Sequence, residues 1–121
     1  MIGLFLDDER NPEDVTWIQY PDDIEWYVFS RYTDFIFAYL NLYESSDLES
    51  TIVSFDHDIQ DSNLLGREVT GYDCLKFLVE FCIEKGVAIP KYYFHTMNPV
   101  GKSNMEHYHN NAKKFIIKES R

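Results

Sequence analysis

Residues 2–8, Ile2-Gly3-Leu4-Phe5-Leu6-Asp7-Asp8, form an apolar run that stops abruptly at two acids, and residues 51–58, Thr51-Ile52-Val53-Ser54-Phe55-Asp56-His57-Asp58, repeat the pattern. Short apolar runs of this kind are typical of strands that are buried on both faces of a parallel sheet. In such sheets, ligands bind beyond the carboxyl ends of the strands. Both stretches therefore predict strands that deliver acidic residues to a binding edge.

Strands and helices are predicted to alternate along the rest of the chain. Apolar and aromatic residues indicate further strands at 24–30 and 91–94, whereas the acids and prolines of 11–23 indicate a loop. This alternation predicts a single α/β domain over residues 1–121, a three-layer sandwich with a central parallel sheet and helices on both faces. Four strands are expected, and residues 115–117 form either a fifth strand or the end of a helix.

Three helices are expected between and after these strands. Apolar residues at helical spacing predict one helix over 33–43 and a clearer one over 70–85, where Thr70 and Asp73 form a capping box. The last helix is predicted to begin at a second capping box, formed by Ser103 and Glu106.

The composition is that of a globular protein and argues against several function classes. Hydrophobic residues make up 45% of the 121 positions, and the formal net charge of −10 argues against broad binding to a nucleic-acid backbone. No apolar run approaches the roughly 18 to 20 residues that cross a bilayer, and the apolar N-terminus is too short for a signal peptide, so a cytoplasmic location without membrane contact is expected. Cys74 and Cys82, about 12 Å apart on one helix, are expected to be reduced core residues.

The predicted strand ends gather four carboxylates. Asp7 and Asp8 follow the first strand, and Asp56 and Asp58 follow the strand at 51–55. Carboxylates in one small volume repel one another unless a cation or protons neutralise them. Mg²⁺ is the simplest such cation, because it accepts a few carboxylates together with substrate phosphate oxygens.

Two histidines and one loop at the same edge are suited to phosphate chemistry. His57 and His95 can exchange protons near pH 7, although each could instead bond only the backbone or a neighbouring acid. The loop that contains Asn98, Gly101 and Lys102 opens the last helix, so its free amides, the helix dipole and the lysine favour an anion. Asn-Pro followed by Gly is also common in turns.

Four motifs link these strand ends to a known family, and they are Leu4-Phe5-Leu6-Asp7-Asp8-Glu9-Arg10-Asn11-Pro12, Ser54-Phe55-Asp56-His57-Asp58, Thr70-Gly71-Tyr72-Asp73 and His95-Thr96-Met97-Asn98-Pro99-Val100-Gly101. In sequence and order they resemble the cyclic-phosphate processing receiver-like domain family, over nearly the whole chain. The resemblance implies a receiver topology with strand order 2-1-3-4 and a site at the carboxyl ends of the strands. It also implies a link to RNA repair and nucleotide processing.

The resemblance also assigns residues. Those that correspond to the acidic metal pocket of receivers are Asp7, Asp8 and Asp56, and those that belong to this family alone are His57, Asp58, His95 and Asn98. Ordinary receivers also need a lysine at the end of a fifth strand, for which Lys118 is a poor candidate. Asp56 is therefore expected to be a metal ligand rather than a phospho-acceptor.

Three functions are compatible with these residues. The first is a metal-dependent phosphoesterase that opens a cyclic phosphate on an RNA end, an ADP-ribose-derived product or a cyclic nucleotide. Its catalytic residues are His57, His95 and Asp56, its Mg²⁺ or Mn²⁺ ligands are Asp7, Asp8, Asp56 and Asp58, and its phosphate-binding residues are Asn98, Gly101, Lys102 and Arg10. The second is a non-catalytic module that binds a cyclic nucleotide or a protein partner. The third is a receiver that accepts a phosphoryl group at Asp56.

Overall fold

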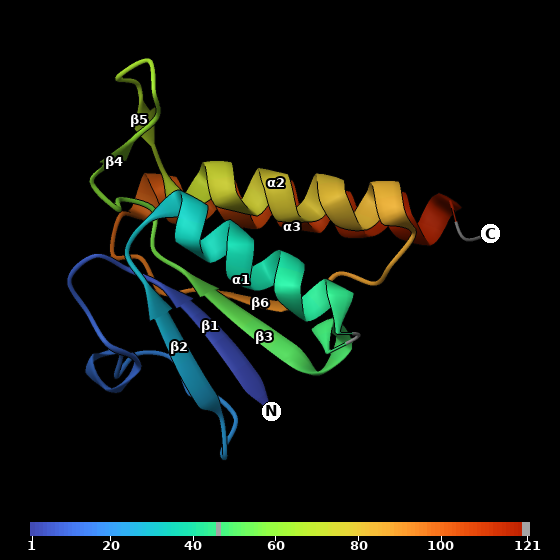
Figure 1. Ribbon diagram of the computed structural model, residues 1–121, viewed down its shortest axis with the longest axis horizontal. Helices are drawn as coiled ribbons and strands as arrows, with labels where there is room; N and C mark the ends of the chain where they lie inside the picture. Colours follow the sequence, from blue (N-terminus) through green and yellow to red (C-terminus); the bar gives the residue numbers. More distant parts are fainter. Residues whose placement is uncertain (46, 120–121) are drawn as a thin grey trace.

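A computed structural model describes residues 1–45 and 47–119, with the backbone alone for residues 49 and 115–119. Its main sheet has four parallel strands, β1 (Ile2–Leu6), β2 (Glu25–Phe29), β3 (Thr51–Phe55) and β6 (Lys91–Phe94). They lie side by side in the order β2-β1-β3-β6 (Figure 1). Counted along the chain this is the order 2-1-3-4, so the expected parallel sheet and receiver-like topology are confirmed.

The connections contain three α-helices, α1 (Tyr32–Glu44), α2 (Gly71–Lys85) and α3 (Pro99–Glu119). Single 3-10 turns occur at η1 (Pro12–Asp14) and η2 (Leu48–Ser50). Between β3 and α2 the chain forms a short antiparallel hairpin of β4 (Asp61–Ser62) and β5 (Glu68–Val69), which projects from the carboxyl-end side of the sheet (Figure 1). Two-residue strands carry no periodic signal, so the sequence does not predict this hairpin.

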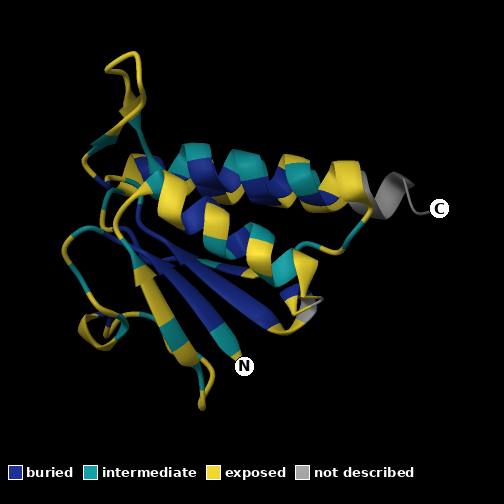
Figure 2. Cartoon of the chain, in the orientation of Figure 1, coloured by how far each residue is buried: buried dark blue, intermediate teal, exposed yellow. Residues whose placement is uncertain are grey.

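All three helices pack on one face of the sheet. The strand register aligns Leu4 with Val53 and Tyr92 in one row, and Leu6 with Phe55 and Phe94 in the next. These two rows form one buried cluster with residues of every helix, among them Phe35, Tyr39, Leu75, Leu78 and Met105. Figure 2 shows the result, since β1 and β3 are buried along their length whereas β2 is largely exposed at the sheet edge.

The opposite face is covered by a loop instead of helices, which corrects one part of the sequence prediction. Tyr20, from the segment between β1 and β2, packs edge-on against Trp26 and Tyr93 of that face. This segment contains Pro12 and Pro21 and many acids, so it forms no more helix than the single turn η1. The second outer layer is therefore an irregular aromatic cover.

Helix ends agree with the sequence in one case and differ in another. Helix α2 begins after Thr70, with the predicted Thr70–Asp73 capping box, and ends at Gly86 in the left-handed conformation. Helix α3 begins at Pro99, four residues before the predicted Ser103, because proline is well suited to the first helical position.

The backbone of residues 115–117 is helical, so within the described residues the sheet gains no fifth strand. The side chain of Lys118 lies outside the described part.

The expectation for the two cysteines is confirmed. Cys74 and Cys82 are free thiols buried in the core, and burial raises the pKa of both. No helix in the described part is both long and apolar enough to cross a membrane.

The buried side chain of His109 on α3 makes stability depend on pH. Its ring packs against Tyr92 and Phe94, and burial, followed by the charge of Lys113, lowers its pKa from 6.5 to about 4. The unfolded chain therefore binds the proton first, and the free energy of unfolding falls as the pH drops from about 6.5 to 4. We expect His109 to account for up to about 3 kcal/mol of that loss.

Urea denaturation at pH 7 and pH 4.5 measures this contribution, because His109→Gln removes it while the carboxylates remain. The wild-type protein should lose more stability between the two pH values than the variant. Equal losses would show that His109 is not held neutral.

Candidate functional site

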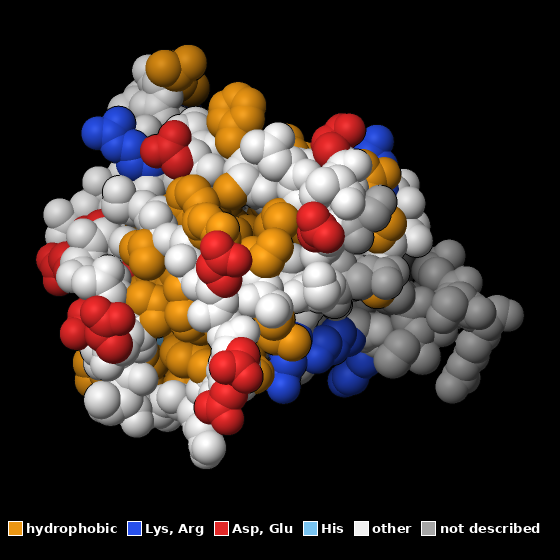
Figure 3. Space-filling model, turned by 60° about the horizontal axis from the view of Figure 1, so that its bottom comes forward, with side chains coloured by type: hydrophobic (Ala, Val, Ile, Leu, Met, Phe, Trp, Pro, Cys, Tyr) orange, Lys and Arg blue, Asp and Glu red, His pale blue; other side chains and the backbone are white. Residues whose placement is uncertain are grey.

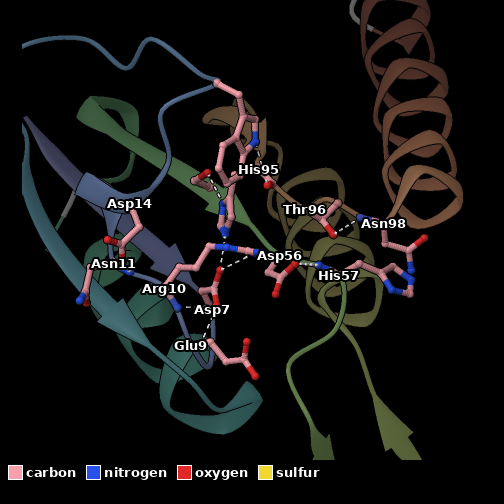
Figure 4. Close-up of polar contacts among 12 residues, drawn as sticks. Asp7, Glu9, Arg10, Asn11, Asp14, Asp56, His57, His95, Thr96 and Asn98 are labelled. Atoms are coloured by element: carbon pink, nitrogen blue, oxygen red, sulfur yellow. Dashed lines mark hydrogen bonds and ion pairs between the residues drawn. The ribbon is translucent and has the colours of Figure 1, made fainter.

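Three buried side chains meet where β1, β3 and β6 end. Asp7, Asp56 and His95 each follow the last residue of their strand, and each strand ends on a residue that faces the helices. Since side chains alternate along a strand, these three point to the opposite face, under the loop. They are 2%, 7% and 0% exposed, and one nitrogen or oxygen atom from each lies within 4.8 Å of the others. Figure 4 shows this cluster, which we call the Asp-Asp-His cluster.

Asp7 is held as a carboxylate by three hydrogen bonds and one ion pair. Its Oδ1 accepts from the amides of Glu9 (2.8 Å) and Arg10 (2.9 Å), and its Oδ2 lies 3.0 Å from Nε2 of His95 and 3.8 Å from the Arg10 guanidinium. Burial would raise the pKa of Asp7, but the bonds from His95 and from the two amides outweigh it and hold the pKa below its usual value. Asp7 therefore carries a negative charge inside the protein.

His95 is locked between two strands. Its Nε2 bonds Asp7, and its Nδ1 lies 2.7 Å from the hydroxyl of Ser54, which lies 2.7 Å from the hydroxyl of Tyr20. Phe5 stacks on the imidazole at 4.2 Å between ring centroids. Both ring nitrogens are thus engaged and no part of the side chain reaches solvent, so His95 fixes the orientation of Asp7.

Asp56 differs electrostatically from Asp7. Burial, followed by the negative charge of Asp7, raises its pKa, although hydrogen bonds from the Thr96 side chain and the His57 amide act in the opposite direction. Its Oδ1 accepts from that amide at 2.9 Å. The two buried carboxylates therefore repel each other, and a cation between them would relieve the repulsion.

A second, more exposed group lies directly after Asp56. Nδ1 of His57 is 2.9 Å from Oδ1 of Asp58, and Nδ2 of Asn98 donates to the other oxygen of Asp58 at 3.1 Å. Oδ1 of Asn98 accepts from the Gly101 amide, which ties this group to the first turn of α3. A Cβ on Gly101 would lie 2.5 Å from the His57 ring, so a glycine at this position allows the first turn of α3 to lie close to that ring.

The Asp58–His57 pair has the arrangement of a general base with its orienting acid. The carboxylate fixes the ring through Nδ1, and no hydrogen bond to Nε2 occurs among the described residues. The His57 side chain is 19% exposed, so Nε2 can meet a ligand. Figure 4 shows His57 and Asn98 beside Asp56, on the side away from Arg10.

The remaining predicted site residues fall in several places. Arg10 lies at the Asp-Asp-His cluster, where its guanidinium carbon lies over Trp17 at 5.6 Å from the ring centroid and its side chain is 32% exposed. Asp8 is half-buried and, within the described residues, is not part of that cluster. Asp58 is bonded to His57 and Asn98 instead. Lys102 lines a separate cavity between β6 and α3.

A larger cavity than that at Lys102 lies at the same end of the sheet as the cluster. It has a volume of about 620 Å³ and is bounded by the β4–β5 hairpin and the start of α1, with Arg31 and Arg67 among its lining residues. None of the residues of the Asp-Asp-His cluster lines it.

The donors fit a hard divalent cation in part. Two carboxylates that face each other in a buried site are suitable ligands for Mg²⁺ or Mn²⁺, which keep water in their other positions. His95 already has both nitrogens engaged, so it fits a role that orients Asp7 better than one as a ligand. We therefore assign Asp7 and Asp56 as the residues that would hold the ion.

Sequence reasoning missed the residues that support His95. Ser54 is the fourth residue of a fully buried strand and lies two positions before Asp56, so both side chains point to the same face of the sheet. A hydroxyl at that position could have been recognised from the sequence as a partner for the site. Tyr20 and Trp17, whose indole N–H donates to the His95 carbonyl at 3.1 Å, come from an irregular loop. No periodic pattern predicts their position.

Comparison with known proteins gives one finding. The family model described as the cyclic-phosphate processing receiver domain matches residues 2–111, which includes every residue of the site. No curated protein and no solved structure matches the chain.

Proposed function

The chain belongs to the cyclic-phosphate processing receiver domain family, and from that premise we propose that it is a metal-dependent phosphoesterase that opens cyclic phosphates. One observation carries the proposal. A buried pair of carboxylates, suited to a divalent cation, is adjacent in the chain to an oriented and partly exposed Asp58–His57 pair, suited to proton transfer.

Opening a cyclic phosphate requires balanced proton transfers. A water oxygen forms a bond to phosphorus while one of the two ring P–O bonds breaks, the water loses a proton, and the leaving alkoxide gains one. Nε2 of His57 accepts the proton from water, and Asp58 stabilises the resulting imidazolium through Nδ1. The protonated ring then supplies the proton that the leaving oxygen needs.

The other residues of the site bind the metal ion and the phosphate, or orient the residues that do so. A divalent ion held by Asp7 and Asp56 would supply Lewis-acid polarisation of the phosphate. Arg10, partly exposed and already near Asp7, donates to a non-bridging phosphate oxygen. His95 acts as a positioning residue in this scheme, because its buried ring holds Asp7 and cannot touch a substrate. Asn98 and Gly101 act through Asp58 and His57.

Direct incubation tests the proposal. The purified protein is incubated with nucleoside 2′,3′-cyclic monophosphates, ADP-ribose 1″,2″-cyclic phosphate and cyclic dinucleotides, with Mg²⁺, Mn²⁺ or EDTA. Products are followed by phosphorus NMR. We expect conversion of at least one compound to a phosphomonoester or an opened phosphodiester, and loss of conversion in EDTA. A folded protein that converts none of them refutes the proposal, and tight binding without conversion would favour a binding module.

His57→Gln is expected to lower turnover by about 10² to 10⁴ and to leave the affinity for Mn²⁺ within a few fold, because the variant loses only the proton-transfer group. Turnover and calorimetric titration with Mn²⁺ measure the two effects. His107→Gln is the matched control, since His107 is exposed on α3. Equal turnover of His57→Gln and wild type would remove His57 from the mechanism.

A further inference from the structure

A cavity of about 310 Å³ lies at the outer edge of the sheet, between β6 and one side of α3. Lys102, His109, Asn110 and Lys113 of α3 contribute to its lining, and Tyr93 of β6 lies opposite. Lys102 and Lys113 are eleven residues apart, which is about 16 Å along a helix. The residues that line the cavity therefore span about three turns of α3, from Lys102 to Lys113.

Among the described residues, no strand pairs with the outer edge of β6, which bounds this cavity. The amide of His95 donates to the carbonyl of Phe55 at 3.0 Å, which turns that peptide group toward β3. Because successive residues of a strand turn their N–H and C=O groups to alternate sides, those of Tyr92 and Phe94 turn to the outer edge. The edge therefore offers N–H donors, alternating with C=O acceptors, toward the cavity.

Positive charge gathers here although the whole chain has a net charge of −10. Lys102 and Lys113 line the cavity, and the ammonium of Lys91 lies over the Tyr93 ring at 5.3 Å. Glu106 is the one acid among the residues described as lining it. Figure 3 shows Lys and Arg side chains together at the lower edge of the molecule, beside hydrophobic side chains.

A buried imidazole without a hydrogen-bond partner also lines the cavity. His109 is 5% exposed, and its Nε2 has no partner among the described residues. A buried polar atom without a partner costs about 1 to 3 kcal/mol. The Nε2 atom itself is enclosed, so the ring reports on a ligand in the cavity rather than binding it.

From these features we propose that the cavity binds a small molecule with at least two phosphate groups, such as a diphosphate ester. Two phosphate groups match two lysines placed about three turns of helix apart, since each group can take one ammonium. Lysine ammonium groups bind phosphate as point charges, and the N–H groups of the strand edge can donate to its oxygens. The cavity contains none of Asp7, Asp56, His57 or Asp58, so this ligand is distinct from the cyclic phosphate of the proposed reaction.

Titration with inorganic pyrophosphate in EDTA tests the proposal, with the ring resonances of His109 and the side-chain resonances of Lys113 followed by NMR. EDTA removes divalent ions, so binding through the Asp-Asp-His cluster does not contribute. We expect saturable shifts of both residues, weaker ones with inorganic phosphate, and none with NaCl at equal ionic strength. Lys113→Gln should weaken binding by about tenfold, and Asp56→Asn should leave it unchanged.

Lys85→Gln is the charge-matched control, since Lys85 is exposed at the end of α2. Its effect should be below about twofold. The proposal is overturned by the absence of saturable shifts at 10 mM pyrophosphate, about the weakest binding that the titration detects, or by equal losses in Lys85→Gln and Lys113→Gln. Neither result depends on whether the protein turns over a cyclic phosphate.

Discussion

Replacing Gly71 by alanine is expected to destabilise the protein by about 3 kcal/mol or more. A Cβ at this position would lie 1.7 Å from the carbonyl oxygen of Asp56 and 2.8 Å from its carbonyl carbon. Both atoms belong to backbone that leaves the central strand β3, so neither can move away as a flexible side chain would. The amide of Gly71 also donates to the carbonyl of His57 at 2.8 Å, which holds the first residue of α2 against that segment.

Urea denaturation measures the effect, and Gly86→Ala separates it from the general cost of replacing a glycine. Gly86 has φ of 67° and open space around its Cβ position, so alanine there meets backbone strain alone. We expect a loss of about 1 kcal/mol for this control. A Gly71→Ala protein as stable as Gly86→Ala would mean that the backbone after β3 yields readily, and the rigid placement of Asp56 and His57 would have to be abandoned.

The fold was largely predictable because its signals are local. Each strand of the main sheet is a short apolar run, and the polar residue that ends it marks the carboxyl edge, so the placement of Asp7, Asp56 and His95 followed from parallel topology. The capping box of Thr70 and Asp73 fixed the start of α2 in the same way. The layer over the second face was not predictable, because Tyr20 and Trp17 lie in a loop whose path is set by tertiary contacts.

The sequence predicted which residues gather at the site, but not which of them contact one another. The sequence places both histidines at strand ends, and it cannot show that His95 is enclosed by Phe5 and Ser54 while His57 stays partly exposed. Their different roles depend on that difference in burial. Asp58 likewise follows the strand as Asp56 does, but its side chain turns to His57 and Asn98.

Asp56→Asn is expected to weaken Mn²⁺ binding by more than tenfold and to lower turnover by about 10³ or more, because one of two charged ligands is lost. Calorimetric titration and the cyclic-phosphate assay measure the two losses. Asp22→Asn removes the same charge from an exposed loop and serves as the control. Unchanged Mn²⁺ affinity in Asp56→Asn would contradict the assignment of this residue as a ligand.

The stability of Asp56→Asn distinguishes loss of a ligand from loss of the fold. Burial and the charge of Asp7 raise the pKa of Asp56, so its ionised form is unfavourable in the folded state without a cation. The side-chain oxygen of an asparagine can still accept the hydrogen bond that the His57 amide now donates to Asp56. In EDTA near neutral pH the variant should therefore unfold at the same or a higher urea concentration than the wild type, and added Mn²⁺ should stabilise the wild type alone. If the variant is instead less stable in EDTA, Asp56 contributes to the fold itself, and its lost turnover would no longer indicate a metal site.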